Sequence, residues 1–240
     1  MWYTYFDPLW WLVIGIGAAL GGIATLRVKS TFARYSQKGT SRGYTGAQVA
    51  AAILRDNYIH DVTIESVPGR LSDHYDPRSK VLRLSEPVYG SQSMAALGVA
   101  AHEVGHAIQH ARGYVPLKFR SAWVPVASIG TNIGWLVIFL AFMLGGVSTA
   151  GGTIAAWVGV ALFGTSTLFT LITLPVEFDA SRRALVSLSE GGYVTAEELT
   201  GARKVLSAAA MTYVAAFVSS LLMLLSYALR LGLLGGSRND

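Results

Sequence analysis

The chain of 240 residues contains no cysteine and few charged residues. Without cysteine, disulfides and thiolate metal ligands are excluded, so histidine and carboxylate side chains must hold any bound metal ion. Only 14% of the residues are charged and 52% are apolar, whereas an average soluble domain carries about 25% charged residues. This composition predicts a membrane protein.

Four apolar stretches are long enough to cross a bilayer, which takes about 20 helical residues. We expect these spans at residues 9–26, 123–144, 153–174 and 207–229. The second and third spans contain no charged residue, and the glycine-rich turn 145–152 joins them into a predicted hairpin. The first span lacks a preceding basic residue and a small-residue cleavage site, which favours a retained anchor over a cleaved signal peptide.

Basic residues are unevenly distributed along the chain. Of the 19 Lys and Arg, 13 lie at 27–120 and four at 182–204, while the amino-terminal tail and the 145–152 turn have none. Because basic residues near helix ends mark the cytoplasmic side, the amino terminus and the turn are predicted outside. Membrane topology therefore explains the net charge of +5 better than nucleic-acid binding does.

These patterns predict an α-helical integral membrane protein with about four transmembrane helices and a small α+β domain. The expected parts are an anchor (1–26), a cytoplasmic region (27–122), a transmembrane hairpin (123–174), a second cytoplasmic segment (175–206), and a transmembrane helix with a tail (207–240).

His102, Glu103 and His106 form the most informative motif of the chain. The preceding run, residues 91–101, has no proline and no charge, so a helix is expected there. Residues four apart on a helix lie nearly above one another, so both imidazoles can reach one zinc ion. Glu103 would face the same cleft as a general base. The alternative is a helix whose histidines only pack.

A catalytic zinc site usually has three protein ligands and one open position. No histidine follows His110, and the third-histidine position of metzincins is Arg112 here. After Glu103 the next acidic residue is Glu177, and two predicted spans return it to the face that carries the histidines. Pro175 suits a helix start, with Glu177 in its first turns. Alternatively, Glu177 only caps that helix, and Asp179 is the second candidate ligand.

The segments His102-Glu-Val-Gly-His106-Ala-Ile-Gln-His110 and Pro175-Val-Glu177-Phe-Asp-Ala-Ser-Arg-Arg183 resemble the YugP-like neutral zinc metallopeptidases. The similarity includes residues 72–78 and covers most of the chain. It implies a bacterial membrane protein whose zinc is bound by His102, His106 and Glu177, with Glu103 as base.

A more distant resemblance links the chain to HtpX-like and CAAX prenyl membrane peptidases. Those proteins often carry a supporting aspartate four residues after the metal-binding glutamate, where this chain has Ser181. Asp179 or another carboxylate is therefore expected to orient a histidine instead.

The remaining soluble part is predicted to contain a helix over 45–58 that begins with a capping box at Thr45 and Gln48. Strands are expected at 62–65 and 80–84, and the turn 76–79 indicates a hairpin. With 80–84 at the sheet edge, this strand could bind an extended substrate. The alternative is a hairpin that only covers the helix.

Several side chains are candidates for supporting roles. His74, Tyr75 and Tyr193 are candidates to stabilise an oxyanion, because that chemistry needs a hydrogen-bond donor, and His110 lies one turn beyond His106. Glycines four apart, at 17 and 21 and at 130 and 134, allow close helix packing within the chain or in a homo-oligomer.

The sequence therefore predicts a zinc endopeptidase at the cytoplasmic face of the inner membrane, acting on membrane-associated or misfolded proteins. One alternative is a zinc-stabilised membrane scaffold that binds a partner without cleaving it, although such a protein does not need Glu103. A small transporter is disfavoured, because the two central spans lack an ionisable residue.

Overall fold

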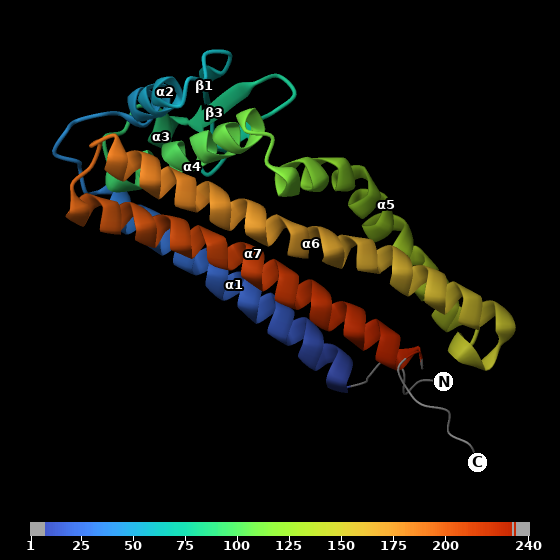
Figure 1. The fold of residues 1–240 in the computed structure, drawn as a ribbon. Coiled ribbons are helices and arrows are strands. Elements are labelled where there is room, and N and C mark those ends of the chain that lie inside the picture. Colours follow the sequence, from blue (N-terminus) through green and yellow to red (C-terminus); the bar gives the residue numbers. More distant parts are fainter. Residues whose placement is uncertain (1–7, 232, 234–240) are drawn as a thin grey trace. The chain divides into compact units, whose positions relative to one another are not determined.

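The computed structural model describes residues 8–231 and 233 (Figure 1). The first seven residues of the predicted anchor and residues 232 and 234–240 of the tail lie outside this described part. The helices are α1 (Pro8–Ser36), α2 (Gly46–Asp56), α3 (Glu86–Tyr89), α4 (Met94–Ala111), α5 (Val115–Met143), α6 (Ala150–Glu190) and α7 (Ala196–Arg230), and the strands are β1 (Thr63–Val67), β2 (His74–Asp76) and β3 (Val81–Ser85).

Two compact units share the chain. The sheet unit comprises residues 24–118 and 174–212, and the described residues of the apolar unit are 8–23, 119–173, 213–231 and 233. Among the residues that the structure describes, four helices, α1, α5, α6 and α7, are long and apolar enough to cross a membrane. The expected helical chain with four apolar helices and a small sheet is thus confirmed.

Within the apolar unit, close helix packing explains the glycines of α5. A side chain at Gly130 would overlap the Thr165 hydroxyl, and one at Gly134 would crowd the backbone of Phe163. These glycines therefore let α5 approach α6 within one chain. A Cβ added at Gly17 would lie at van der Waals distance from Ser219 of α7, whereas one added at Gly21 would meet no atom within 4 Å.

The helix predicted to begin at Pro175 does not begin there, because α6 runs unbroken from Ala150 to Glu190. A proline inside a helix costs about 3 kcal/mol or more, so tertiary packing must offset it. A stripe spaced four residues apart supplies that packing: Val176, Ala180, Ala184 and Leu188 are all fully buried. Glu177 thus lies in mid-helix, and the alternative that it caps a helix start is wrong as well.

The sheet has the strand order β1-β3-β2. Strand β3 pairs in parallel with β1 and antiparallel with β2, so the predicted hairpin is confirmed as β2–β3. The prediction that residues 80–84 form a sheet edge is wrong. Strand β3 forms hydrogen bonds with β1 along one edge and with β2 along the other. Its residues are buried on both faces of the sheet, which favours the central position.

The core of the sheet unit lies where α2 and α4 pack with the sheet. Fully buried side chains from these elements include Ile53, Leu82, Leu97 and Val104. The capping box at the start of α2 is confirmed, since Thr45 and Gln48 each bond the other's backbone N–H. This core holds α4, the helix that carries His102 and His106, in place.

Candidate metal centre

Helix α4 presents His102 and His106 side by side. Its start is capped by Ser93, whose hydroxyl oxygen accepts a hydrogen bond from the Ala96 N–H at 3.2 Å. The two imidazole rings have their centroids 4.8 Å apart and stand nearly perpendicular, at 84°. One helical turn thus directs both side chains to one point, as the spacing predicts.

Helix α6 brings Glu177 to the same point. Its Oε2 lies 3.3 Å from His102 Nε2 and 3.6 Å from His106 Nε2. One ligand atom from each of the three residues lies within 4.8 Å of the others. Glu177 is almost fully buried, with 2% of its surface exposed. A carboxylate this deep needs a cationic or metal partner.

Gly105 makes this approach of the helices possible. A side chain at this position would overlap the carbonyl oxygen of Ala180 on α6. Only the absence of a side chain at Gly105 leaves room for this close neighbour. The short contact brings Glu177, less than one turn before Ala180, against the histidine face of α4.

The donor set fits a zinc ion. Zinc bonds to nitrogen and carboxylate oxygen are about 2.0–2.2 Å long, so neighbouring donors of a tetrahedral site lie about 3.3–3.6 Å apart. The separations from Glu177 to the two histidines, 3.3 and 3.6 Å, match this range. With three protein donors, a tetrahedral ion would retain one position for water or substrate.

Both histidines are held from behind through Nδ1. The Ser181 hydroxyl lies 3.1 Å from His102 Nδ1, and Gln109 Oε1 lies 3.1 Å from His106 Nδ1. Asp179 does not touch a histidine in these contacts. It accepts a hydrogen bond from Gln109 instead, so Asp179 is linked to His106 Nδ1 through the intervening amide.

Gln109 is the residue that sequence reasoning missed. It is completely buried, although glutamine is usually exposed. The available signal was its place three residues after His106, on the same side of the helix. Ser181, noted as a departure from the HtpX-like pattern, itself contacts His102.

Glu103 is buried on α4, with 8% of its surface exposed. Its charge acts on His106. Burial lowers the pKa of His106, but the nearby carboxylates of Glu177 and Glu103 outweigh this effect and raise the pKa. A buried carboxylate whose charge acts on His106 has the chemistry needed to transfer a proton near that side chain.

The structure places the candidate oxyanion donors in other contacts. His74 lies exposed on β2, with Nδ1 2.9 Å from the Ser72 carbonyl oxygen. The Tyr193 hydroxyl donates to Asp56. Tyr75 contacts His110, with its hydroxyl 2.8 Å from Nδ1. None of the contacts found for these three side chains involves the His102, His106 and Glu177 cluster.

Burial raises the pKa of Tyr75 to about 12. Its hydroxyl therefore stays protonated at neutral pH and forms a hydrogen bond with His110 Nδ1. This bond ties β2 to the end of α4.

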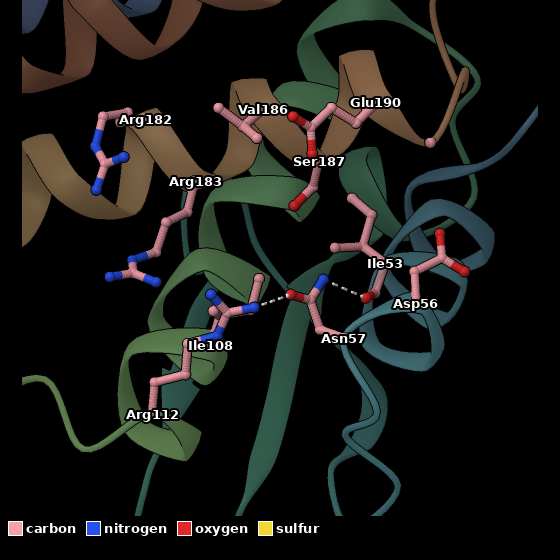
Figure 2. A pocket seen from close by; sticks show the side chains of 11 residues that line it. Ile53, Asp56, Asn57, Ile108, Arg112, Arg182, Arg183, Val186, Ser187 and Glu190 are labelled. Atoms are coloured by element: carbon pink, nitrogen blue, oxygen red, sulfur yellow. Dashed lines mark hydrogen bonds between the residues drawn. The ribbon is translucent and has the colours of Figure 1, made fainter.

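A separate cavity of about 440 Å³ lies in the sheet unit and is shown in Figure 2. Its lining residues are Ile53, Asp56, Asn57, Ile108, Arg112, Arg182, Arg183, Val186, Ser187, Glu190 and Gly191. No member of the His102, His106 and Glu177 cluster contributes to it. Arg182 and Arg183 connect the two regions, because both donate hydrogen bonds to Asp179.

Comparison with known proteins agrees with the chemistry of this cluster. Residues 10–232 match the family described as "Putative neutral zinc metallopeptidase". The chain is 45% identical over 204 residues to "Putative membrane protease YugP" of Bacillus subtilis (strain 168), which covers 85% of this chain and 88% of that protein. No solved structure matches the chain. The predicted resemblance is confirmed, and the chain belongs to this neutral zinc metallopeptidase family.

Proposed function

We propose that the protein is a zinc-dependent membrane endopeptidase in which His102, His106 and Glu177 bind the metal and Glu103 is the general base. The observation that carries the proposal is the spacing of the three donors, 3.3 and 3.6 Å from Glu177 to the histidines. The family description and the name of the Bacillus relative support the same class of reaction.

When bound, zinc would lower the pKa of a water molecule and polarise the substrate carbonyl. Glu103 then takes a proton from the attacking water and delivers it to the departing amine. Its burial near His106 holds the carboxylate in a fixed position, as this role requires. Proton transfer by a positioned side chain contributes about 10²- to 10⁴-fold in rate. A scaffold that only binds zinc would not need this carboxylate.

The test uses purified protein in detergent, with zinc content and casein cleavage measured on the same samples. Glu103→Gln is expected to retain zinc and lose about 10²- to 10⁴-fold in cleavage rate. Glu177→Ala is expected to lose both zinc and cleavage, because it removes one of three ligands. Glu190→Gln, an exposed position on the same helix, is the matched control and should behave as wild type.

Two results would contradict the proposal. Unchanged zinc content in Glu177→Ala would remove Glu177 as a ligand. Full zinc content in wild type and in Glu103→Gln, with no cleavage of casein or of unfolded membrane proteins by either, would favour the zinc-stabilised scaffold.

The proposal includes an active site on the cytoplasmic side of the bacterial inner membrane, where unfolded or membrane-associated proteins are the substrate class. The basic residues at 27–120 and 182–204 support this orientation. Because the chain has no cysteine, single-cysteine variants can be labelled specifically in intact cells.

His60→Cys marks the sheet unit, and Val147→Cys marks the turn between α5 and α6; both positions are exposed. A membrane-impermeant maleimide should label Val147→Cys in intact cells and His60→Cys only after the inner membrane is permeabilised. The opposite labelling order would reverse the proposed orientation.

A further inference from the structure

We propose that Gln109 is a positioning residue that selects the tautomer of His106 with its hydrogen on Nδ1. This inference deepens the proposed function and rests on it in one respect, namely that Nε2 of His106 binds the metal. The tautomer itself depends only on residues of the chain.

The hydrogen bonds of Gln109 determine which way its amide points. Its Nε2 donates to the Val176 carbonyl oxygen at 2.8 Å and to Asp179 Oδ2 at 2.9 Å. Both N–H groups are thereby used, since an amide has two. The reverse orientation would place the amide oxygen against a carbonyl and a carboxylate, three acceptors with no hydrogen between them, at a fully buried position.

The orientation of the amide determines the state of His106. The remaining Gln109 group, Oε1, lies 3.1 Å from His106 Nδ1 and can only accept a hydrogen bond. His106 Nδ1 must therefore carry the hydrogen. In a neutral imidazole this leaves the lone pair on Nε2, the nitrogen that lies 3.6 Å from Glu177 Oε2.

The support of His102 is chemically different. Its Nδ1 lies 3.1 Å from the Ser181 hydroxyl, which can either donate or accept. Ser181 thus accommodates both tautomers of His102 and selects neither. The side chains of the protein fix the tautomer of His106 but leave that of His102 open. General packing would not produce this difference between the two histidines.

Asp179 is the residue that holds the amide in this orientation. It is 9% exposed and accepts hydrogen bonds from Arg182 and Arg183 as well as from Gln109. The two arginines line the cavity shown in Figure 2. Their positive charges offset the cost of burying the carboxylate and favour its ionised, purely accepting form.

The test compares Gln109→Met, which keeps the length of the side chain without its polar atoms, with Ser181→Ala and Gln37→Met. Gln37 is exposed and serves as the matched control. The first measurement is zinc affinity by competition with a chelator. Gln109→Met should raise the zinc Kd about 10- to 100-fold, Ser181→Ala should raise it less, and Gln37→Met should leave it unchanged.

The second measurement is independent of zinc. The ¹⁵N chemical shifts of the ring nitrogens distinguish protonated from unprotonated Nδ1 in metal-free protein at alkaline pH, and His106→Asn identifies the His106 signals among the five histidines. Wild type should show a single His106 tautomer with the hydrogen on Nδ1. Gln109→Met should show a mixture of tautomers, and a purely structural role for Gln109 would not change this signal.

Asp179→Asn provides a second route if Gln109→Met does not fold. It keeps Gln109 but removes the charge that orients its amide. The zinc Kd and the His106 tautomer should therefore change in the same direction as in Gln109→Met, by a smaller amount. A folded Gln109→Met protein with wild-type zinc affinity, or with His106 still entirely in the Nδ1–H form, would overturn the inference. If wild type showed the expected tautomer but bound no zinc, the proposed function would fail and the assignment of Gln109 would stand.

Discussion

The imidazole Nε2 of His102 lies 3.3 Å from the carboxylate Oε2 of Glu177, although 75 positions of the chain separate the two residues. This contact connects α4 to α6 and completes a set of three donors with His106. The intervening residues include the whole of α5 and most of the apolar part of α6. The candidate site therefore depends on how closely these two helices pack.

Gly105→Ala should disturb that packing. The added methyl group would overlap the Ala180 carbonyl oxygen, and forcing extra volume into a packed interior costs about 1–3 kcal/mol. We expect a lower unfolding temperature and weaker zinc binding, because the shift separates Glu177 from the histidines. Gly90→Ala is the control, since a Cβ there meets no atom within 4 Å. If the two variants had the same unfolding temperature and zinc affinity, α6 could shift without loss of stability or of zinc binding.

Zinc removal should destabilise the protein. A ligand that binds only the folded state at 100 times its Kd stabilises it by about 2.7 kcal/mol. Treatment with a strong chelator should therefore lower the unfolding temperature of wild type, and added zinc should restore it. Glu177→Ala should unfold at nearly the same temperature with and without chelator. If the chelator left the unfolding temperature of wild type unchanged, this result would argue against a metal at this cluster.

The pH dependence of zinc binding should follow His106. Burial lowers the pKa of this histidine, but Glu177 and the charge of Glu103 raise it above the usual value. Because zinc requires the neutral imidazole, affinity should begin to fall at a higher pH than for an ordinary histidine, whose pKa is about 6.5. Glu103→Gln should move this fall to lower pH. Zinc affinity measured by chelator competition across the pH range provides the check.

The stability of the metal-free protein should depend on the protonation of His106 in the opposite direction from zinc affinity. A folded-state pKa raised above the unfolded value means that protonated His106 contributes stability below about pH 6.5, and that this contribution is lost as pH rises through the raised pKa. Thermal unfolding of chelated wild type against His106→Asn measures the difference. A constant difference across this range would contradict the raised pKa.

Tyr193→Phe distinguishes a structural role from the oxyanion role considered for this tyrosine. Burial and Asp56 raise the pKa of Tyr193 to about 12, so its hydroxyl stays protonated and donates to Asp56. We expect a loss of about 1 kcal/mol in the free energy of unfolding and an unchanged kcat. Tyr58→Phe, at an exposed tyrosine, is the control. A large fall in kcat with unchanged stability would restore Tyr193 as an oxyanion donor.

Local patterns in the sequence determined much of this protein. Long uncharged stretches identify the four apolar helices, because a bilayer sets the length that each helix needs. The four-residue spacing of His102 and His106 directs both imidazoles to one side of α4 by helix geometry alone. The capping box of α2 is equally local. Glu177 emerged as a candidate because the acidic residues that follow Glu103 are so few.

Tertiary structure decided what depends on contacts between distant segments. Packing of the buried stripe on α6 carries the helix through Pro175, against the local preference of proline. The parallel return of β1 makes β3 the central strand rather than an edge. Gln109 meets Val176 and Asp179 across 67 and 70 positions. A side chain's hydrogen-bond partners on another helix follow from how the helices pack, and that packing reflects the whole core rather than any short stretch of sequence.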